Sequence, residues 1–141
     1  MDVPLLNVKK FTLYELDTHG LKTIMAGEKA LRFSDRYTVS NMDYTDNSKK
    51  FVSNMKANYG VYKANLVHLK GDVMYVREDG ITFNTNTMFY NTVTKIATTK
   101  DPYTSNKGES HMSGHGLVYN AKLKQMKSQS VQIIYKLDEE Q

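Results

Sequence analysis

Apolar and polar residues alternate with a period of two in several short stretches of the chain. In residues 51–57 and 131–137 the odd positions are apolar or small and most even positions are polar. Residues 11–13 and 81–83 repeat this pattern over shorter spans. Because side chains on a β-strand point to alternate faces, each stretch offers one apolar face. The pattern therefore predicts β-strands, and the frequent Thr, Tyr and Val residues favour the same structure.

Turn signals separate these stretches. Asp79-Gly80 lies between two apolar segments and predicts a hairpin whose turn needs a positive φ. Further turns or breaks are predicted at residues 18–20, 46–48, 70–72, 101–102 and 114–116. Residues 21–33 are predicted as a strand rather than a helix, because Gly20 and Gly27 interrupt them. Short strands at this regular spacing indicate an all-β sandwich or roll.

One phrase occurs twice in the second half of the chain. Residues 88–105 and 116–135 both set a Tyr-Asn pair before a polar stretch, an apolar residue and small hydroxyl residues. Tyrosine also precedes an apolar residue by six or seven positions in four places, namely Tyr44 and Phe51, Tyr75 and Ile81, Tyr90 and Ile96, and Tyr119 and Met126. This spacing predicts a strand, a tight turn and a returning strand. Stacked repeats and a simple antiparallel meander both account for it.

Composition adds limits to this picture. The chain has 141 residues, which suggests one domain, and it contains no cysteine. No apolar run approaches the roughly 20 residues that a membrane helix needs. The N-terminal stretch lacks the apolar core of a signal peptide. The formal net charge of +4 suits an anionic partner, such as a nucleic acid or a lipid phosphate, but also suits simple solubility.

The sequence contains few residue patterns typical of catalytic or metal-binding sites. His111 and His115 would stand about 13 Å apart on a strand, too far for one metal ion. The chain has no Gly-x-Ser-x-Gly elbow and no glycine-rich phosphate loop, and its carboxylates sit mostly in predicted turns. We therefore expect no enzyme, no cofactor and no metal site. Residues 59–63 mix tyrosine with lysine, which suits nucleic-acid binding, but the cations are spread along the whole chain and favour a solvated surface.

Four motifs together resemble the LptC family of lipopolysaccharide export proteins. They are the opening FTLYELDTHGLKTIMAGEKALRF at 11–33, then Ser53-x-Met55-x-Ala57-x-x-Gly60-x-Tyr62, Leu69-x-Gly71-x-Val73, and Gly114-x-Gly116-Leu117-x-Tyr119-Asn120. Each motif is short, and their order and spacing carry the resemblance from about Lys10 to Tyr135.

The resemblance implies a twisted open β-jellyroll of two facing antiparallel sheets with an apolar groove. It implies a periplasmic protein that receives lipopolysaccharide from the inner-membrane ABC transporter on its N-terminal side. The C-terminal edge would then pass the lipid to LptA. Members of the family carry an N-terminal membrane helix, and residues 1–9 do not resemble one. These residues are therefore expected to be a tail, with the membrane anchor expected before them in the full-length protein. Residues 10–137 are expected to form the domain and residues 138–141 a C-terminal tail.

Strand parity predicts which side chains line the groove. These residues are Phe11, Leu13, Val39, Met55, Val73, Ile81, Phe83, Leu117, Val131, Ile133 and Tyr135. The edge strand expected to meet LptA consists of Val131, Gln132, Ile133, Ile134, Tyr135, Lys136 and Leu137. Lys9, Lys10 and Arg32 are expected near the groove rim, where they would meet lipid phosphates.

Three alternatives stay open at this point. The first is a soluble bridge protein of the LptA type, which shares the fold. The second is a basic β-domain that binds nucleic acid. A basic stripe on one face, without an apolar groove, would favour this alternative. The third is a structural β-domain whose interior is completely filled by its own side chains.

Overall fold

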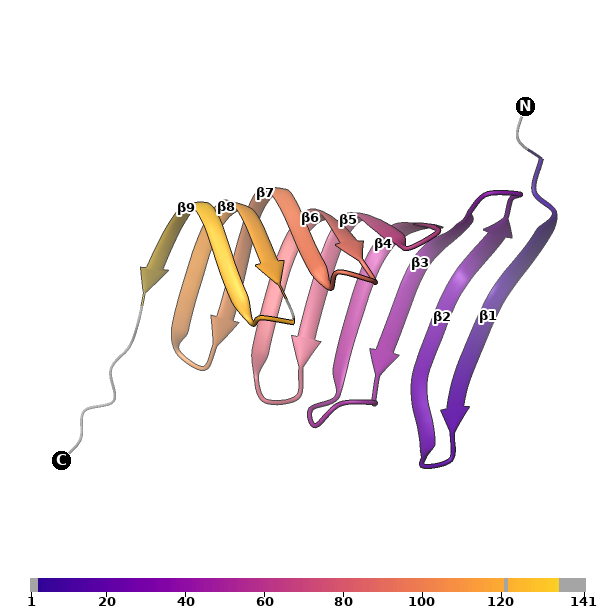
Figure 1. Ribbon diagram of the computed structural model, residues 1–141, viewed down its shortest axis with the longest axis horizontal. Coiled ribbons are helices and arrows are strands. Elements are labelled where there is room, and N and C mark those ends of the chain that lie inside the picture. Colours follow the sequence, from indigo (N-terminus) through magenta and orange to yellow (C-terminus); the bar gives the residue numbers. More distant parts are fainter. Residues whose placement is uncertain (1–2, 121, 135–141) are drawn as a thin grey trace.

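The protein folds into a single antiparallel β-sheet. In a computed structural model, residues 3–120 and 122–134 are described, and they form nine strands and no helix (Figure 1). The strands are β1 (Leu6–Asp17), β2 (Gly20–Arg32), β3 (Tyr37–Asp46), β4 (Ser53–Lys63), β5 (Leu66–Arg77), β6 (Ile81–Asn91), β7 (Ile96–Lys107), β8 (Ser110–Asn120) and β9 (Gln125–Ile134). The all-β, open jellyroll-like fold class predicted from the sequence is confirmed.

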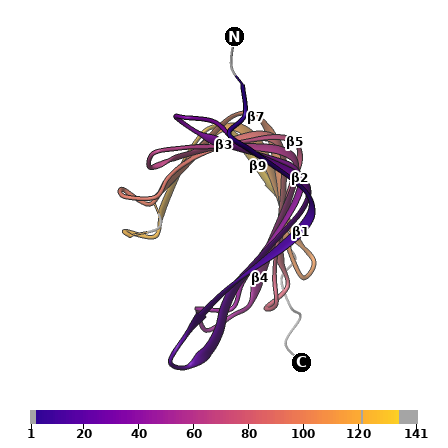
Figure 2. The same ribbon diagram turned by 90° about the vertical axis from the view of Figure 1, so that its right-hand side faces the viewer.

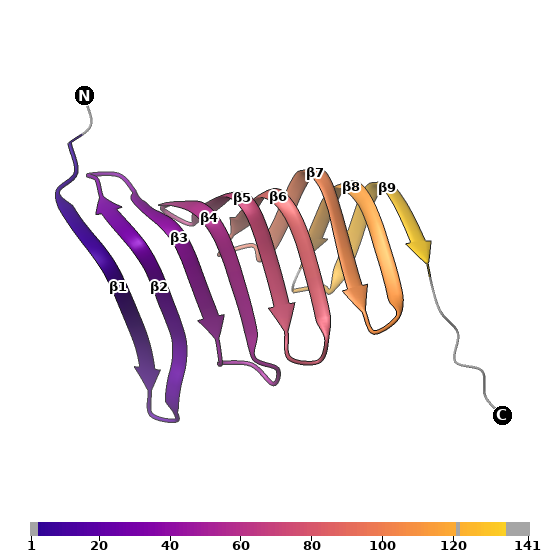
Figure 3. The same ribbon diagram turned by 180° about the vertical axis from the view of Figure 1, so that it is seen from behind.

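Strand order in the sheet follows the sequence from β1 to β9. Each strand pairs antiparallel with its sequence neighbours, so β1 and β9 are the two edges and the sheet does not close (Figures 1 and 3). Seen along the long axis, the strands follow an arc (Figure 2). The two facing layers expected of a jellyroll are therefore the two halves of the same bent strands.

The bend lies where the strand pairing is interrupted. Between β3 and β4, for example, the pair Ser40 and Tyr59 is followed by Met42 and Ala57, so the residues between them are skipped. Positive φ values occur at or beside these interruptions, at Lys10 (49°), Asn41 (51°), Gly71 (81°), Asp72 (46°) and Gly116 (69°). Between β4 and β8 the register also shifts at this place, as it does where one strand of a pair carries an extra residue. Between the first four strands, and between β8 and β9, one or two residues of each strand are unpaired there and the register is unchanged. These irregular positions near the middle of neighbouring strands produce the arc.

One predicted turn and two predicted breaks prove to be irregular positions inside strands. Residues 70–72 lie inside β5, residues 101–102 inside β7 and residues 114–116 inside β8. The predictions of a turn and of breaks there were wrong, because Gly, Asp and Pro suit an irregular strand position as well as a chain reversal. The hairpin at Asp79-Gly80 is confirmed, with Gly80 at a φ of 100°.

Near the N-terminus one predicted strand is confirmed, and the first strand begins earlier than expected. Residues 21–33 are a strand over nearly their whole length, as predicted. β1 begins at Leu6, earlier than the expected domain start at residue 10.

The eight hydrophobic residues that are buried in the described part of the chain all lie on one face of the sheet. They are Val39, Met42, Ala57, Leu69, Val73, Met88, Tyr103 and Leu117. Phe11, Met25, Tyr44, Met55, Tyr62 and Phe83 are among the partly buried residues that pack against this core. A single sheet without a second layer can bury side chains only on its concave side, so this face is the inside of the arc (Figure 2).

Val73 tests whether the concave face is the stabilising core. Its side chain is 1% exposed, whereas its neighbour Met74 points to the opposite face and is 43% exposed. We expect Val73→Ala to lower the free energy of unfolding by about 1–3 kcal/mol, because it leaves a cavity in packed surroundings. Met74→Ala is expected to change it by less than about 0.5 kcal/mol. Urea unfolding followed by circular dichroism measures both, and equal effects would contradict this assignment of the faces.

Candidate functional site

A continuous row of mostly apolar side chains crosses the concave face through all nine strands. Directly paired residues in an antiparallel sheet lie on the same face, so the pairing defines the row. We call it the apolar row; its members from β1 to β9 are Leu13, Met25, Tyr44, Met55, Tyr75, Phe83, Ser105, Met112 and Ile133. Ser105 is its one residue that is neither apolar nor aromatic.

A second row crosses the concave face on the other side of the bend. We call it the tyrosine row; it consists of Leu6, Arg32, Tyr37, Tyr62, Val67, Tyr90, Ala97, Tyr119 and Met126. Four of its nine members are tyrosines, which offer an apolar ring with a polar tip. The Arg32 guanidinium lies over the Tyr37 ring, 5.1 Å from its centroid. The two rows are the two walls of the bent sheet.

Burial of the apolar row decreases towards the two edges of the sheet. Leu13 on β1 is 66% exposed and Ile133 on β9 is 60% exposed, whereas Met55 and Phe83 on the inner strands pack against the core. The edge strands have a neighbour on one side only, so their apolar side chains lack half of their contacts. The concave face therefore ends in open apolar surface at both edges.

The convex face carries a mixed row opposite the apolar row, in which five of nine residues are polar. Opposite the apolar row it carries Tyr14, Ile24, Thr45, Asn54, Val76, Thr82, Asn106, His111 and Ile134. Neighbours in this row bond to one another: Asn54 Nδ2 donates to Thr45 Oγ1 over 3.0 Å, and His111 Nδ1 lies 2.6 Å from Asn106 Oδ1. This hydrogen bonding explains why the alternation of the sequence places amides and hydroxyls on the outside.

Burial raises the pKa of three tyrosines of the concave face. It raises the pKa of Tyr62 to about 12, with a smaller contribution from the nearby Tyr44. Burial also raises the pKa of Tyr90, and it raises that of Tyr44 together with the charge of Asp46. These phenols are therefore uncharged near neutral pH, so they present rings and hydroxyl groups and no acid–base chemistry.

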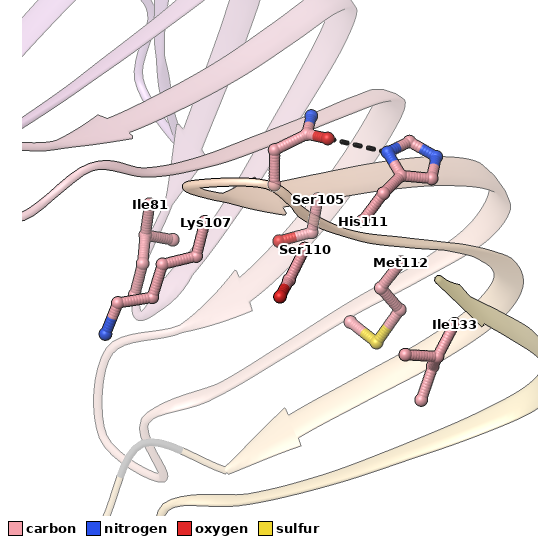
Figure 4. Close-up of a pocket in the computed structure, with 8 residues that line it drawn as sticks. Ile81, Ser105, Lys107, Ser110, His111, Met112 and Ile133 are labelled. Carbon is pink, nitrogen blue, oxygen red and sulfur yellow. Dashed lines mark hydrogen bonds between the residues drawn. The ribbon is translucent and has the colours of Figure 1, made fainter. Parts of the chain in front are cut away.

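A shallow hollow of about 170 Å³ opens at the end of the apolar row (Figure 4). Met112 and Ile133 from the row line it together with Ile81, and Ser105, Ser110 and Lys107 add polar groups. In Figure 4 the dashed line marks the bond from His111 to the amide of Asn106. The hollow is too small for a whole drug-sized molecule, but it is lined mainly by carbon atoms.

Tyr103 on β7 fills part of the concave face. Its side chain is 2% exposed, its ring stacks on Phe83 with 5.5 Å between centroids, and its hydroxyl donates to Ser128 Oγ over 2.8 Å. Gly114 makes room for it, because a Cβ there would lie 2.9 Å from the Tyr103 hydroxyl and 2.0 Å from the Ser130 carbonyl oxygen. The middle of the concave face is thus filled by the protein's own side chains.

Ten of the eleven predicted groove residues are described, and all ten lie on the concave face. They are Phe11, Leu13, Val39, Met55, Val73, Ile81, Phe83, Leu117, Val131 and Ile133. Tyr135 lies outside the described residues. Val39, Val73 and Leu117 are buried, whereas Leu13, Val131 and Ile133 are exposed. Whether this face binds a ligand remains a prediction.

Sequence parity missed several residues of the same face, among them Met42, Leu69 and Tyr62. Each bulge shifts the alternation by one position, so the inward residues of β4 change from Met55 and Ala57 to Gly60 and Tyr62. A single-phase pattern cannot follow this change. The spacing of two, three and two between those residues is the signal that could have found it.

The predicted cations lie at three different places. Lys9 pairs with Lys29 on the convex face, and Lys10 is unpaired in β1 with a φ of 49°. Arg32 stands in the tyrosine row, on the concave side. The expectation of Lys9 at the groove rim was wrong, because the unpaired Lys10 with its positive φ places Lys9 and Phe11 on opposite faces.

The structure also bears on the remaining alternatives. No group of three or more His, Asp or Glu residues that could hold a metal occurs among the described residues. The concave face is apolar, whereas the nucleic-acid hypothesis expected no apolar groove. The filled interior expected of a structural domain is present in the middle strands and ends at the exposed edges.

β9 is the C-terminal edge of the described sheet and pairs with β8 alone. Its residues Val131, Ile133 and Ile134 are 47%, 60% and 57% exposed. Tyr135, Lys136 and Leu137, which the sequence assigned to the same partner edge, lie outside the described residues.

Comparison with known proteins identifies the family. Comparison with curated protein sequences returns no match. The described part of the chain contains no helix that is long and apolar enough to span a membrane. The family model "Lipopolysaccharide-assembly, LptC-related" matches residues 2–136, nearly the whole chain. This family takes part in lipopolysaccharide transport in the periplasm, in connection with the inner membrane. The chain therefore belongs to the LptC family.

Proposed function

We propose that the concave face binds the acyl chains of lipopolysaccharide and passes the lipid from the inner-membrane ABC transporter to LptA. The observation that carries the proposal is the apolar row, which crosses all nine strands with Ser105 as its one polar member and ends exposed at both edges. Family membership supports the cargo, and the row supplies an apolar path for it.

The row suits transfer better than tight storage. Methionine is unbranched and adaptable, so Met25, Met55 and Met112 can adjust to acyl chains in different conformations. The filled middle strands limit how deeply a chain can enter, so the lipid lies along the face instead of inside a closed cavity. Weak contacts at many equivalent positions permit onward movement, and the energy comes from the ATP of the transporter.

The two open edges give the transfer a direction. In this proposal β1 receives lipid on the transporter side and β9 delivers it to LptA. An unpaired edge strand presents free N–H and C=O groups and can accept a further strand from another protein. A partner sheet added in register would extend the apolar row beyond Ile133. The link of the family to the inner membrane supports an anchor on the N-terminal side of the full-length protein.

Lipid contact can be tested with photo-crosslinking residues. Phe83 and Ile133 lie in the apolar row, whereas Gln132 lies on the convex face in a row with Ser113. We expect probes at positions 83 and 133 to trap lipopolysaccharide, and a probe at position 132 to trap at least about fivefold less. The adduct is measured by immunoblotting with an antibody against the lipid.

Position 132 is a matched control because it is adjacent to Ile133 on the same edge strand, β9, and points to the opposite face. Equal trapping at positions 132 and 133 would show that the lipid does not distinguish the two faces. That result would contradict the proposal.

The β9 edge can be tested with proline. Neighbouring residues of a strand point their N–H groups to opposite sides, so of Ile133 and Ile134 one faces β8 and the other the open edge. Proline removes the N–H, and at the open edge it leaves the sheet intact. We expect the edge-facing proline variant to fold and to lose at least about tenfold in LptA capture. Circular dichroism checks folding and a pull-down measures capture.

Lys49→Pro provides the control, because residue 49 lies in the turn between β3 and β4, far from β9. It should leave LptA capture unchanged. Full capture by both folded proline variants of β9 would exclude this edge as the docking strand and would point to β1 instead.

A further inference from the structure

The phrase that the sequence repeats forms two equivalent turns. Asn91 Oδ1 accepts hydrogen bonds from the backbone N–H groups of Val93 and Thr94, both over 2.9 Å, and Asn120 Oδ1 accepts one from Leu123 over 3.1 Å. The asparagine in each case follows a tyrosine of the tyrosine row. These two turns join β6 to β7 and β8 to β9, so they lie at the same end of the strands.

Each of these turns ends in a lysine with an unusual backbone conformation. Lys95 has a φ of 62° and Lys124 a φ of 53°. For a residue with a side chain this left-handed region costs about 1–2 kcal/mol relative to the ordinary conformation, and glycine avoids the cost. Ala64 has the same conformation on the same side of the sheet, so the backbone alone does not explain the lysines; what the two turns share is a cation at the same place.

The turns of the sheet form two rims of different charge. The basic rim comprises residues 32–37, 63–66, 91–96 and 120–125, which carry six cations and one carboxylate. The mixed rim comprises residues 17–20, 46–53, 77–81 and 107–110, which carry four cations and five carboxylates. Consecutive antiparallel strands alternate in direction, so the two rims lie at opposite ends of the strands and border opposite sides of the concave face (Figure 2).

Charge on the basic rim is uneven. At its β2–β3 end, Asp35 binds Arg36 over 2.8 Å and Lys63 over 3.4 Å. The two cations hold the pKa of Asp35 below its usual value, with the Arg36 hydrogen bond as the largest cause. No carboxylate among the described residues pairs with Lys95, Lys122 or Lys124. The positive charge that remains available therefore lies at the β6–β9 end.

These lysines stand directly beyond the tyrosine row. Tyr90 and Tyr119 are the last concave-face residues before the two turns, and exposed Val93 and Leu123, at 56% and 63%, flank the lysines. An amphiphile whose acyl chains lie on the concave face would pass its headgroup over this rim. Lysine binds phosphate as a point charge, with short charge-assisted hydrogen bonds.

We propose that Lys95 and Lys124, assisted by Lys122, bind the phosphate groups of the lipid whose acyl chains occupy the concave face. This inference rests on the proposed function and adds an orientation to it. The phosphorylated headgroup lies towards the basic rim, whereas the mixed rim, with its excess of carboxylates, repels it. Each lipid thus travels along the sheet with the same side facing the basic rim.

The test compares two ligands and a variant expected to be at least as stable as the wild type. The variant is Lys95→Gly with Lys124→Gly, which removes two charges and relieves two left-handed conformations. The ligands are lipid A with two phosphates and the same lipid after dephosphorylation. We expect the wild type to bind the phosphorylated form about tenfold more tightly, as two partly exposed charge-assisted bonds allow. The double variant should lose this preference and keep its affinity for the dephosphorylated lipid.

Two control variants separate charge from conformation and from net charge. Ala64→Gly relieves a φ of 52° on the same rim without removing charge. Lys49→Gln with Lys50→Gln removes two charges from the mixed rim. Both should keep the phosphate preference, and thermal unfolding should show that the double glycine variant melts no lower than the wild type.

The outcomes distinguish this inference from the function on which it rests. If the wild type binds neither lipid, the proposed function fails and the inference fails with it. If the wild type binds both lipids equally, or if the double glycine variant retains the preference, only the inference is overturned. A loss of binding to phosphatidylglycerol vesicles with an unchanged preference between the two lipids would also overturn it, because the lysines would then contact a membrane surface.

Discussion

The interruption of pairing near the middle of every strand is the constraint on which this fold depends. A single sheet has no second layer to cover its apolar face, so it can bury side chains only by bending. The skipped positions around Asn41 and Asn58, and their counterparts in the other strands, supply that bend. The same irregularity changes the parity of the inward side chains. The bend and the apolar lining on both sides of it therefore have one origin in the sequence.

Much of this architecture could be predicted from the sequence. Period-two alternation located the strands, and the hairpin at Asp79-Gly80 followed from local turn chemistry. Phe83 and Ile133 lie on the concave face, as the alternation predicted. No irregular strand position separates either residue from the apolar neighbours used to assign the inward positions. In such segments local pattern and tertiary structure agree.

The remainder depends on information that a local pattern does not contain. Residues 70–72 and 114–116 carry the glycines of a turn, yet neighbouring strands on both sides hold them in the sheet as irregular strand positions. Tyr103 is almost fully buried, although its sequence context beside Pro102 suggests a break. Its partner Ser128 lies two strands further along, so only the assembled sheet reveals its role.

Strand order has a consequence for the way the protein folds and opens. Each strand meets only its neighbours in the sequence, so contact order is low and the sheet is close to one-dimensional, with stability passed from neighbour to neighbour. In such an array local unfolding starts at the ends, where a strand has a single neighbour. β1 and β9 should therefore fray first. A strand added by another protein at either end would supply the missing neighbour, and assembly would then stabilise the fold as it extends the sheet.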